Sequence, residues 1–333
     1  MLIFLIRVKM ETKPSSQMAV TIPPVNTIYL SLVVPCFNEE AVVPLFFDET
    51  VKICTPINEQ FELIFVDDGS RDNTLNILRQ LANQDKRIHY ISFSRNFGKE
   101  AAMLAGLQAA HGEYIVTLDV DGQDPPSLIP QMLEAVVSGE YDCAATRRVS
   151  RTGEQPVRSF FARCFYALMK KITDIEIISG SRDFRLMNRK YLEAILAISE
   201  RNRFSKGIFP WIGFKTKWFE YENIERKAGK TKWSFWKLFV YSLDGIIAFS
   251  TKPLAIASVL GIVLFIIALF FIIFIVIRRI VWGDPVDGWA STICIILFCS
   301  GIQLFTTGIL GQYMAKAYTE VKQRPQFIVR EAL

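Results

Sequence analysis

The sequence predicts an α/β protein with a mostly parallel β-sheet domain, followed by amphipathic helices and a pair of transmembrane helices. Short apolar runs rich in β-branched residues alternate with helical patterns through the first half of the chain, which is typical of βαβ units. Acidic residues directly follow two of these runs, at the strand ends where open α/β sheets bind ligands. Two long uncharged segments follow residue 253, and the mean hydropathy of the whole chain is +0.26.

The composition narrows the class of protein. With 333 residues, the chain has room for one large domain or one domain with an appendage. Its net charge of +5 is weak and scattered, so no nucleic-acid partner is expected. The six cysteines form no C-x-x-C pair, which argues against a zinc site or a disulfide framework and favours reduced thiols in a cytosolic catalytic part.

The first 27 residues are predicted to be a disordered leader. The apolar run at residues 1–9 is too short to span a bilayer, which needs about 20 residues. No small-residue cleavage site follows it, so a secretory signal peptide is not expected. Residues 10–27 are rich in Pro, Ser and Thr. A catalytic domain is therefore expected at residues 28–232.

Five apolar runs in this expected domain are predicted to be strands of one parallel sheet. Helical patterns follow them up to about residue 54, at residues 98–110 and after Pro126. Helices between successive strands are the usual connection in parallel sheets, and they cover both faces. The predicted strands are residues 30–35, 61–66, 88–93, 115–118 and 141–146.

Three acidic residues follow the fourth predicted strand within six positions: Asp119, Asp121 and Asp124. Carboxylates this close repel one another unless a cation lies between them. Mg²⁺ or Mn²⁺ is the expected cation, because one or two carboxylates together with substrate phosphates can hold it. This D-x-D pattern therefore suggests a nucleoside-diphosphate site. The alternative is a solvated acidic turn, closed by Pro125 and Pro126.

The second predicted strand ends in another acidic pair, Asp67 and Asp68. Helix capping is the alternative role for this pair, but Ser70 or Asp72 can cap the following helix. We therefore expect Asp67 and Asp68 to bind the base or ribose of a nucleotide. Lys99, at the start of the helix after the third strand, is placed to meet a nucleotide at that helix N-terminus. The alternative there is a solvated lysine.

The second half of the expected catalytic domain has less regular patterns. Residues 158–172 have apolar positions at helical spacing with basic flanks, which favours a helix in the membrane interface or, alternatively, one packed on the sheet. Residues 179–188 are predicted to be a loop and a strand, and residues 215–221 a short edge hairpin. A juxtamembrane amphipathic helix is expected at residues 233–252.

Residues 253–316 are predicted to form two transmembrane helices. The uncharged segments 254–277 and 288–315 are each long enough to cross the roughly 30 Å hydrocarbon core. Seven basic residues flank the outer ends of the pair, against two in the connecting loop, so the positive-inside rule places both ends in the cytoplasm. The sequence thus predicts an integral membrane protein with a cytoplasmic catalytic domain and a cytoplasmic tail at residues 317–333.

Six segments form a set whose order and spacing can be compared with known families. They are VPCFNEE (34–40), VDDGSRDNT (66–74), SRNFGK (94–99), DVDGQDPP (119–126), SRDFRLM (181–187) and RKAGKTKW (226–233). This set resembles glycosyltransferase family 2, whose fold is GT-A, over residues 30 to about 250. The resemblance is strongest with the polyprenyl-phosphate branch, which includes bactoprenol glucosyltransferases and dolichol-phosphate mannose synthases. The two C-terminal spans agree with the bacterial glucosyl branch.

The resemblance implies transfer of one sugar from a nucleotide donor to the phosphate of a long isoprenoid. It favours UDP-glucose as donor and undecaprenyl phosphate as acceptor, with GDP-mannose as the alternative donor. It also implies Mg²⁺ or Mn²⁺ as cofactor and the lipid bilayer as partner, and it leaves room for a homo-oligomer such as a tetramer. An acceptor phosphomonoester has a pKa of about 6 and needs little help from a base at neutral pH. We therefore expect direct displacement with inversion.

The matched segments also imply roles for individual residues. Asp119, Asp121 and Gln123 are expected around the metal and the diphosphate, with Asp119 and Asp121 in catalytic roles. Arg226 and Lys232 are expected to be catalytic through the substrate phosphates. The remaining candidates, expected to bind the nucleoside or the phosphates, are Pro35, Asn38, Glu39, Asp67, Asp68, Lys99, Arg147, Asp183 and Arg185.

Two alternative functions fit parts of the sequence. A processive polysaccharide synthase usually has more spans and a Q-x-x-R-W motif, which this chain lacks. A non-catalytic membrane scaffold or lipid transporter is the other alternative, and the intact D-x-D-x-Q pattern argues against it. One departure from the dolichol enzymes is Gly122-Gln123-Asp124 in place of Leu-Gln-His, which leaves the role of Asp124 open.

Overall fold

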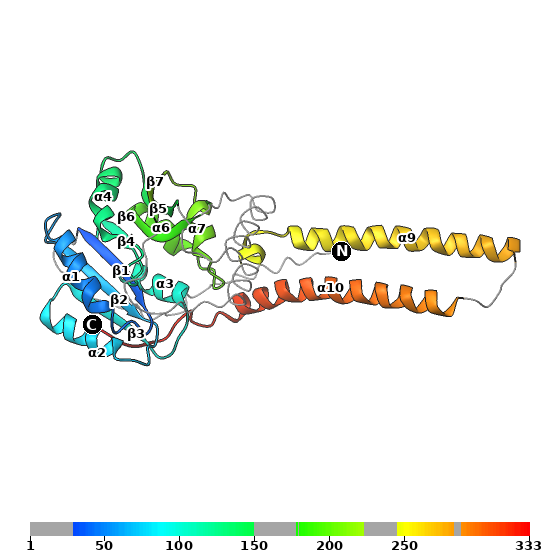
Figure 1. The fold of residues 1–333 in the computed structure, drawn as a ribbon, viewed down its shortest axis with the longest axis horizontal. Helices are drawn as coiled ribbons and strands as arrows, with labels where there is room; N and C mark the ends of the chain where they lie inside the picture. Colours follow the sequence, from blue (N-terminus) through cyan, green and yellow to red (C-terminus); the bar gives the residue numbers. More distant parts are fainter. Residues whose placement is uncertain (1–28, 150–177, 179, 223–244, 283–287) are drawn as a thin grey trace, which may run out of the picture.

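The computed structural model describes residues 29–149, 178, 180–222, 245–282 and 288–333. Its strands are β1 (Leu30–Cys36), β2 (Phe61–Asp67), β3 (Ile88–Phe93), β4 (Tyr114–Thr117), β5 (Cys143–Arg148), β6 (Ser181–Asn188), β7 (Thr216–Tyr221) and β8 (Val329–Ala332). They form one sheet with the order β7-β5-β6-β4-β1-β2-β3-β8 (Figure 1). Strands β1 to β4 are parallel, whereas β6 and β8 run antiparallel to their neighbours. The predicted mixed α/β class, with a central and mostly parallel sheet, is confirmed.

Helices cover both faces of this sheet. They are α1 (Val43–Cys54), α2 (Thr74–Gln84), α3 (Lys99–Ala109), the short 3-10 helix η1 (Pro126–Leu128), α4 (Ile129–Val137), α6 (Arg189–Ala197), α7 (Ser205–Trp211), α9 (Lys252–Trp282) and α10 (Trp289–Lys322). Apolar side chains of α1, α2 and α4 join one core cluster. Those of α3, α6 and α7 join a second cluster on the opposite face.

Alternation along the central strands places their side chains in both clusters. In β2, Leu63 belongs to the first cluster and Ile64 to the second. Successive side chains of a strand point to opposite sides, so a strand covered on both faces needs an uninterrupted apolar run. Gly106 lets α3 approach the sheet closely, since a Cβ there would lie 2.3 Å from Val33 Cγ1.

Two details of the sheet differ from the sequence prediction. The predicted fourth and fifth strands, β4 and β5, are not neighbours, because β6 lies between them and pairs antiparallel with both. Residues 215–221 do not form a hairpin: β7 is an edge strand parallel to β5, in register from Cys143 with Thr216 to Arg148 with Tyr221. Both differences arise from pairing between segments far apart in the chain, which local patterns do not encode.

Helices α9 and α10 pack against each other as a long hairpin that projects away from the sheet (Figure 1). Within the described residues, one segment, Lys252–Phe271, is long and apolar enough to cross a membrane, with a mean hydropathy of 3.0. The hydroxyl of Tyr313 in α10 donates a hydrogen bond to the carbonyl of Ser250, just before α9. This contact joins the two helices at their domain end. A second crossing by α10 stays a prediction.

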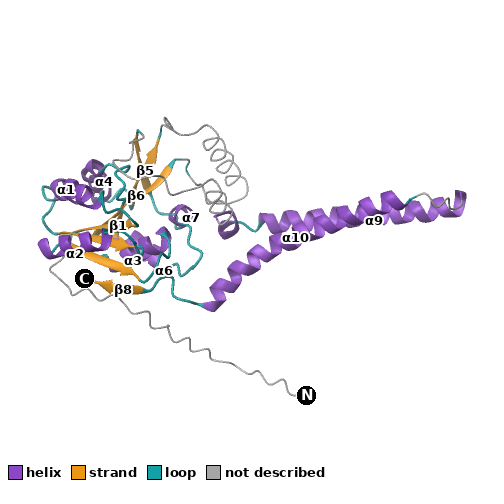
Figure 2. Cartoon of the chain, turned by 60° about the horizontal axis from the view of Figure 1, so that its bottom comes forward, coloured by secondary structure: helices purple, strands orange, loops and turns teal. Residues whose placement is uncertain are grey.

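The residues of the predicted cytoplasmic tail, 317–333, form regular structure and contact the sheet domain. Helix α10 continues past its predicted end, and β8 pairs antiparallel with β3 at the edge of the sheet (Figure 2). Arg79 of α2 donates two hydrogen bonds of 2.8 Å to Glu331 of β8. Phe327 stacks on Phe93 with ring centroids 5.0 Å apart. The end of the chain is therefore part of the sheet domain.

Some predictions concern parts of the chain outside the described residues. These parts are the leader, the amphipathic segment 158–172, the portion of the juxtamembrane helix before residue 245, and the basic residues Arg226 and Lys232.

Candidate active site

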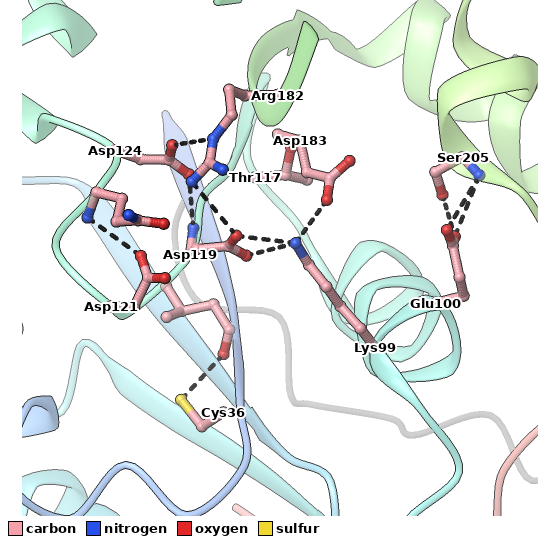
Figure 3. A network of polar contacts seen from close by, with 12 residues as sticks. Cys36, Lys99, Glu100, Thr117, Asp119, Asp121, Asp124, Arg182, Asp183 and Ser205 are labelled. Atoms are coloured by element: carbon pink, nitrogen blue, oxygen red, sulfur yellow. Dashed lines mark hydrogen bonds and ion pairs between the residues drawn. The ribbon is translucent and has the colours of Figure 1, made fainter. Parts of the chain in front are cut away.

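A cluster of charged side chains lies at the carboxyl end of β4, between β6 and the first turn of α3 (Figure 3). Lys99 Nζ is 2.7 Å from Asp119 Oδ1 and 2.5 Å from Asp183 Oδ2. Arg182 Nε donates to Asp124 Oδ1 at 3.0 Å. We call these five residues the carboxylate centre. Three of them, Lys99, Asp119 and Asp183, are predicted site residues that the structure brings into direct contact.

Three elements assemble the carboxylate centre. Asp119 follows β4 shortly after Thr117, whose hydroxyl donates to the Asp183 carbonyl in β6 at 2.5 Å. Lys99 is the first residue of α3 and follows Gly98, whose φ of 101° is a conformation that favours glycine. The sheet therefore positions the two carboxylates, and the first turn of α3 delivers the ammonium group between them.

The two carboxylates determine the charge state of Lys99. Burial alone would lower the pKa of Lys99, but Asp119 and Asp183 outweigh it and hold that pKa above its ordinary value. Burial would raise the pKa of Asp183, yet Lys99 keeps it well below its ordinary value. The Lys99 side chain is still 36% exposed, so a ligand can reach it. The alternative of a merely solvated lysine does not hold.

Asp124 is buried and holds the turn after β4. Its Oδ1 accepts hydrogen bonds from Arg182 and from the Tyr221 hydroxyl (2.9 Å), and its Oδ2 accepts one from the Asp119 N–H (3.2 Å). Burial raises the pKa of Asp124, and Arg182 opposes that rise. The role that the sequence leaves open is thus to position Asp119. The sequence prediction missed Arg182 and Tyr221; Arg182 precedes Asp183 in a matched segment, whereas Tyr221 has no such signal.

Asp121 and Gln123 lie in the same turn. The N–H of Gln123 donates to Asp121 Oδ1 at 3.1 Å, and Gly122 between them has a φ of 73°. No group of three or more His, Cys, Asp or Glu side chains in the described part of the chain is arranged to hold a metal ion. Mg²⁺ needs only one or two protein carboxylates when substrate phosphates supply other ligands. The carboxylate oxygens of Asp119 and Asp121 fit a hard cation of this kind.

Asp67 and Asp68 bind to groups within the chain. Asp67 accepts hydrogen bonds from the Ser70 N–H (3.0 Å) and the Ser92 hydroxyl (2.8 Å). Asp68 accepts from the backbone N–H groups of residues 97–98, at 2.6 and 3.0 Å. Burial raises the pKa of Asp68 to about 6. These partners were not anticipated from the sequence, and a contact with the nucleotide stays a prediction.

The loop after β1 is attached to the loop after β2. The N–H of Asn38 donates to Ser70 Oγ, and the N–H of Glu39 donates to Thr74 Oγ1, both at 2.8 Å. Asn38 has a φ of 52°, a conformation that asparagine tolerates better than most residues. Pro35 lies in β1, next to this loop. The predicted nucleoside-binding residues thus gather at the carboxyl ends of two adjacent parallel strands.

Two predicted substrate-binding arginines lie elsewhere. Arg185 is buried, and its guanidinium carbon lies 4.3 Å from the ring centroid of Phe209 and 5.2 Å from that of Trp218. Arg147 forms an ion pair with Glu220 between β5 and β7. The structure therefore places neither arginine in the carboxylate centre. For Arg185 the reason is that its strand position faces the core cluster rather than the strand end.

A mostly parallel sheet with acidic loops at its strand ends defines a class of α/β proteins that bind ligands at that edge, and comparison with known proteins specifies it further. Residues 31–196 match glycosyl transferase family 2. Together with the relatives below, this match shows that the chain belongs to glycosyltransferase family 2. It is therefore a glycosyltransferase, and the predicted family is confirmed.

Several relatives are similar over nearly their whole length. An uncharacterized glycosyltransferase of Synechocystis sp. is 39% identical over 92% of this chain and 96% of its own. A prophage bactoprenol glucosyl transferase homolog of Escherichia coli (strain K12) is 40% identical over 90% and 98%. The bactoprenol glucosyl transferase of Shigella phage SfII is 40% identical over 91% and 98%. A solved structure, glucosyl-3-phosphoglycerate synthase from Mycobacterium tuberculosis with Mn²⁺, UDP and phosphoglyceric acid, is similar over 66% of this chain and 76% of that chain, with a TM-score of 0.44 and 20% identity.

Proposed function

We propose that this glycosyltransferase, with a GT-A domain, transfers a single glucose from UDP-glucose to the phosphate of a polyprenyl lipid, undecaprenyl phosphate, at the cytoplasmic face of a membrane. The observation that carries the proposal is the ammonium group of Lys99 held between Asp119 and Asp183 at the carboxyl end of β4. This arrangement supplies fixed charges of both signs where a metal and a diphosphate can bind. The names of two relatives, which refer to bactoprenol glucosyl transferases, support the acceptor class.

The charge distribution of the carboxylate centre suits phosphate chemistry without a general base. The acceptor phosphomonoester is mostly a dianion at neutral pH, since its second pKa is about 6. One of its oxygens bonds to the anomeric carbon while the bond from that carbon to the diphosphate breaks, so the configuration inverts. The electron pair of the broken bond stays on the departing diphosphate. Mg²⁺ or Mn²⁺, when bound, neutralises part of that charge. Asp119 and Asp121 would hold the metal with Gln123 beside them, and Lys99 adds a fixed positive charge.

The helical hairpin supports delivery of the acceptor from a membrane. The segment Lys252–Phe271 is apolar enough to cross, and α10 runs back beside α9. We propose two crossings, with the sheet domain in the cytoplasm and the connecting loop that the sequence predicts at residues 278–287 outside. Arg226 and Lys232 then hold the acceptor phosphate near headgroup depth through charge-assisted hydrogen bonds. Labelling of a Gly283→Cys variant from outside tests this topology, and labelling only from the cytoplasmic side contradicts it.

Membranes that contain the full chain test the donor. They are incubated with undecaprenyl phosphate and either UDP-[¹⁴C]glucose or GDP-[¹⁴C]mannose, and label in the lipid extract is counted. We expect label from UDP-glucose. A strong preference for GDP-mannose would overturn the donor and leave the reaction class standing. No transfer to lipid from any nucleotide sugar would overturn the proposed function.

A further inference from the structure

A pocket lies where the sheet domain meets the domain end of α10. Its cavity volume of about 330 Å³ falls in the range of small-ligand sites. Three stretches of chain line it: the first turn of α3, residues 201–203 before α7, and the end of α10 with the residues that follow it. The pocket is distinct from the carboxylate centre, because Lys99 turns to Asp119 and Asp183 whereas the neighbouring Phe97 and Glu100 line the pocket.

Most charged side chains in the pocket are basic. Arg201, Lys322 and Arg324 line it, and none of them forms an ion pair with an acid in the described part of the chain. Arg203 adds a fourth cation, whose guanidinium donates to the carbonyl of Ile198 at 2.7 Å. A pocket lined by basic side chains from two distant segments of the chain suits a negatively charged ligand.

One acidic residue, Glu100, also lines the pocket, and its carboxylate accepts hydrogen bonds from Ser205. The Ser205 hydroxyl and N–H both donate to the Glu100 carboxylate. Burial raises the pKa of Glu100, so its negative charge is disfavoured there. The pocket therefore keeps an excess of positive charge.

The position of the pocket along α10 points to a membrane lipid. Tyr313 of α10 contacts Ser250 at the start of the apolar hairpin, and α10 continues from there towards the sheet domain. Tyr318 and Lys322 are five and nine residues further on, so they lie about 8 and 14 Å beyond that level at 1.5 Å per residue. The polar layer on each side of a bilayer is about 5 to 8 Å thick. The α10 wall of the pocket thus extends from the outer limit of the headgroup layer, at Tyr318, to about 6 Å beyond it, at Lys322.

We propose that this pocket binds the phosphate group of a membrane lipid. The proposal depends on the membrane placement of α9 and α10 given above, but not on sugar transfer. Cations at the end of a helix also complement its dipole, which accounts for Lys322 and Arg324 alone. It does not account for Arg201, which comes from the segment before α7 and lines the same hollow. A phosphate bound by several arginines and a lysine accounts for all of them.

Equilibrium binding of phosphatidylglycerol to the full chain in detergent, followed by native mass spectrometry, tests the proposal. The variant Arg201→Gln with Arg324→Gln should bind at least about tenfold more weakly, because each charge-assisted hydrogen bond contributes about that factor. Arg330→Gln with Lys86→Gln is the matched control, since it also removes two positive charges and both residues are exposed and do not line the pocket. Equal weakening of lipid binding in this control would mean that the effect comes from the net charge of the protein and not from the pocket, which would overturn the proposal. Unchanged binding by the variant Arg201→Gln with Arg324→Gln would also overturn the proposal.

Three further arms identify the ligand and its location. Diacylglycerol, which has no phosphate, should bind at least tenfold more weakly than phosphatidylglycerol, and equal binding overturns a phosphate site. Inorganic phosphate at the same concentration should not displace the lipid. Displacement would mean that the pocket binds free phosphate, which contradicts a lipid site. Asp119→Asn should leave lipid binding unchanged, and a loss there would place the lipid in the carboxylate centre instead. Since no arm contains a sugar donor, failure of this inference is separate from failure of the proposed function.

Discussion

Lys99 Nζ lies 2.7 Å from Oδ1 of Asp119, which joins the first residue of α3 to the turn after β4. In the proposed reaction the same carboxylate would help to hold a divalent metal ion near the diphosphate. Lys99 must then share Asp119 with the metal or turn towards the phosphates. In both cases its ammonium group adds positive charge where the leaving diphosphate gains negative charge.

Lys99→Gln should therefore lower turnover by roughly 10² to 10³, as is usual when one preorganised stabilising group is lost. The measurement is turnover at saturating donor and acceptor. Lys86→Gln removes the same charge from an exposed position and serves as the matched control. Equal turnover in the two variants contradicts a catalytic role for Lys99.

A methyl group added to the turn after Asp67 and Asp68, by the substitution Gly69→Ala, should lower the free energy of unfolding. Gly69 has a φ of 68°, and a Cβ there would lie 2.5 Å from the carbonyl carbon of Arg95. Gly139 has a similar φ of 76°, but a Cβ at that position meets nothing within 4 Å. Gly139→Ala should thus report only the backbone strain, about 1 kcal/mol or somewhat more.

Gly69→Ala should lower the free energy of unfolding by clearly more than Gly139→Ala, because the backbone of residue 95 must also move. Denaturant unfolding of both variants in detergent measures the difference. If the two substitutions lower the free energy of unfolding equally, a Cβ at position 69 does not clash with the backbone of residue 95.

The segment just before the C-terminal strand β8 should contribute to the stability of the sheet domain. Phe327 stacks on Phe93, and Phe93 makes an edge contact of 5.7 Å with Phe97 in the loop before α3. Phe327→Ala should lower the free energy of unfolding by about 2 kcal/mol, less than for a fully buried phenylalanine. Ile328→Ala, at an exposed neighbouring position, should have little effect. Similar losses in both variants would mean that the aromatic stack adds nothing.

Asp68 should make stability depend on pH. Its pKa in the folded protein is about 6, whereas the ordinary value is 3.8, so the folded state binds this proton more tightly than the unfolded state. The resulting stabilisation is fully present below about pH 4 and is lost as pH rises through 6. It amounts to at most about 3 kcal/mol. Asp68→Asn should flatten the change in melting temperature between pH 4 and 6.5, with the exposed Asp48→Asn as control. An identical pH profile for Asp68→Asn and wild type contradicts this effect.

Local sequence patterns were sufficient for most strands but not for their order in the sheet. The predicted strand at residues 61–66 corresponds to Phe61–Asp67, because a run covered on both faces must be apolar throughout. The insertion of β6 between β4 and β5 depends on pairing across dozens of residues, so no local pattern encodes it. Strand β8 was missed because its four residues, VREA, contain two adjacent charged side chains and form neither an apolar run nor an alternating pattern.

The candidate site likewise combines residues that the sequence predicts with contacts that depend on the folded arrangement. Lys99, Asp119 and Asp183 lie in matched segments, and their side chains meet in the structure. The partners of Asp124 come from positions 58 and 97 residues away, so their contacts follow only from the folded arrangement. Burial of a guanidinium beneath aromatic rings, as in Arg185, also requires the packing of distant elements and cannot be inferred from a motif.

Formation of UDP and glucosyl lipid by the purified full chain tests the proposed function most directly. The protein is incubated in detergent with UDP-glucose, undecaprenyl phosphate and Mg²⁺, and both products are measured. We predict equal amounts of the two products, no UDP release without the lipid phosphate, and no turnover in EDTA. Asp121→Ala should lower turnover by roughly 10² to 10³, and the exposed Asp48→Ala should leave it unchanged. UDP release that does not require the lipid, or full turnover of Asp121→Ala in EDTA, would contradict metal-assisted transfer to a polyprenyl phosphate.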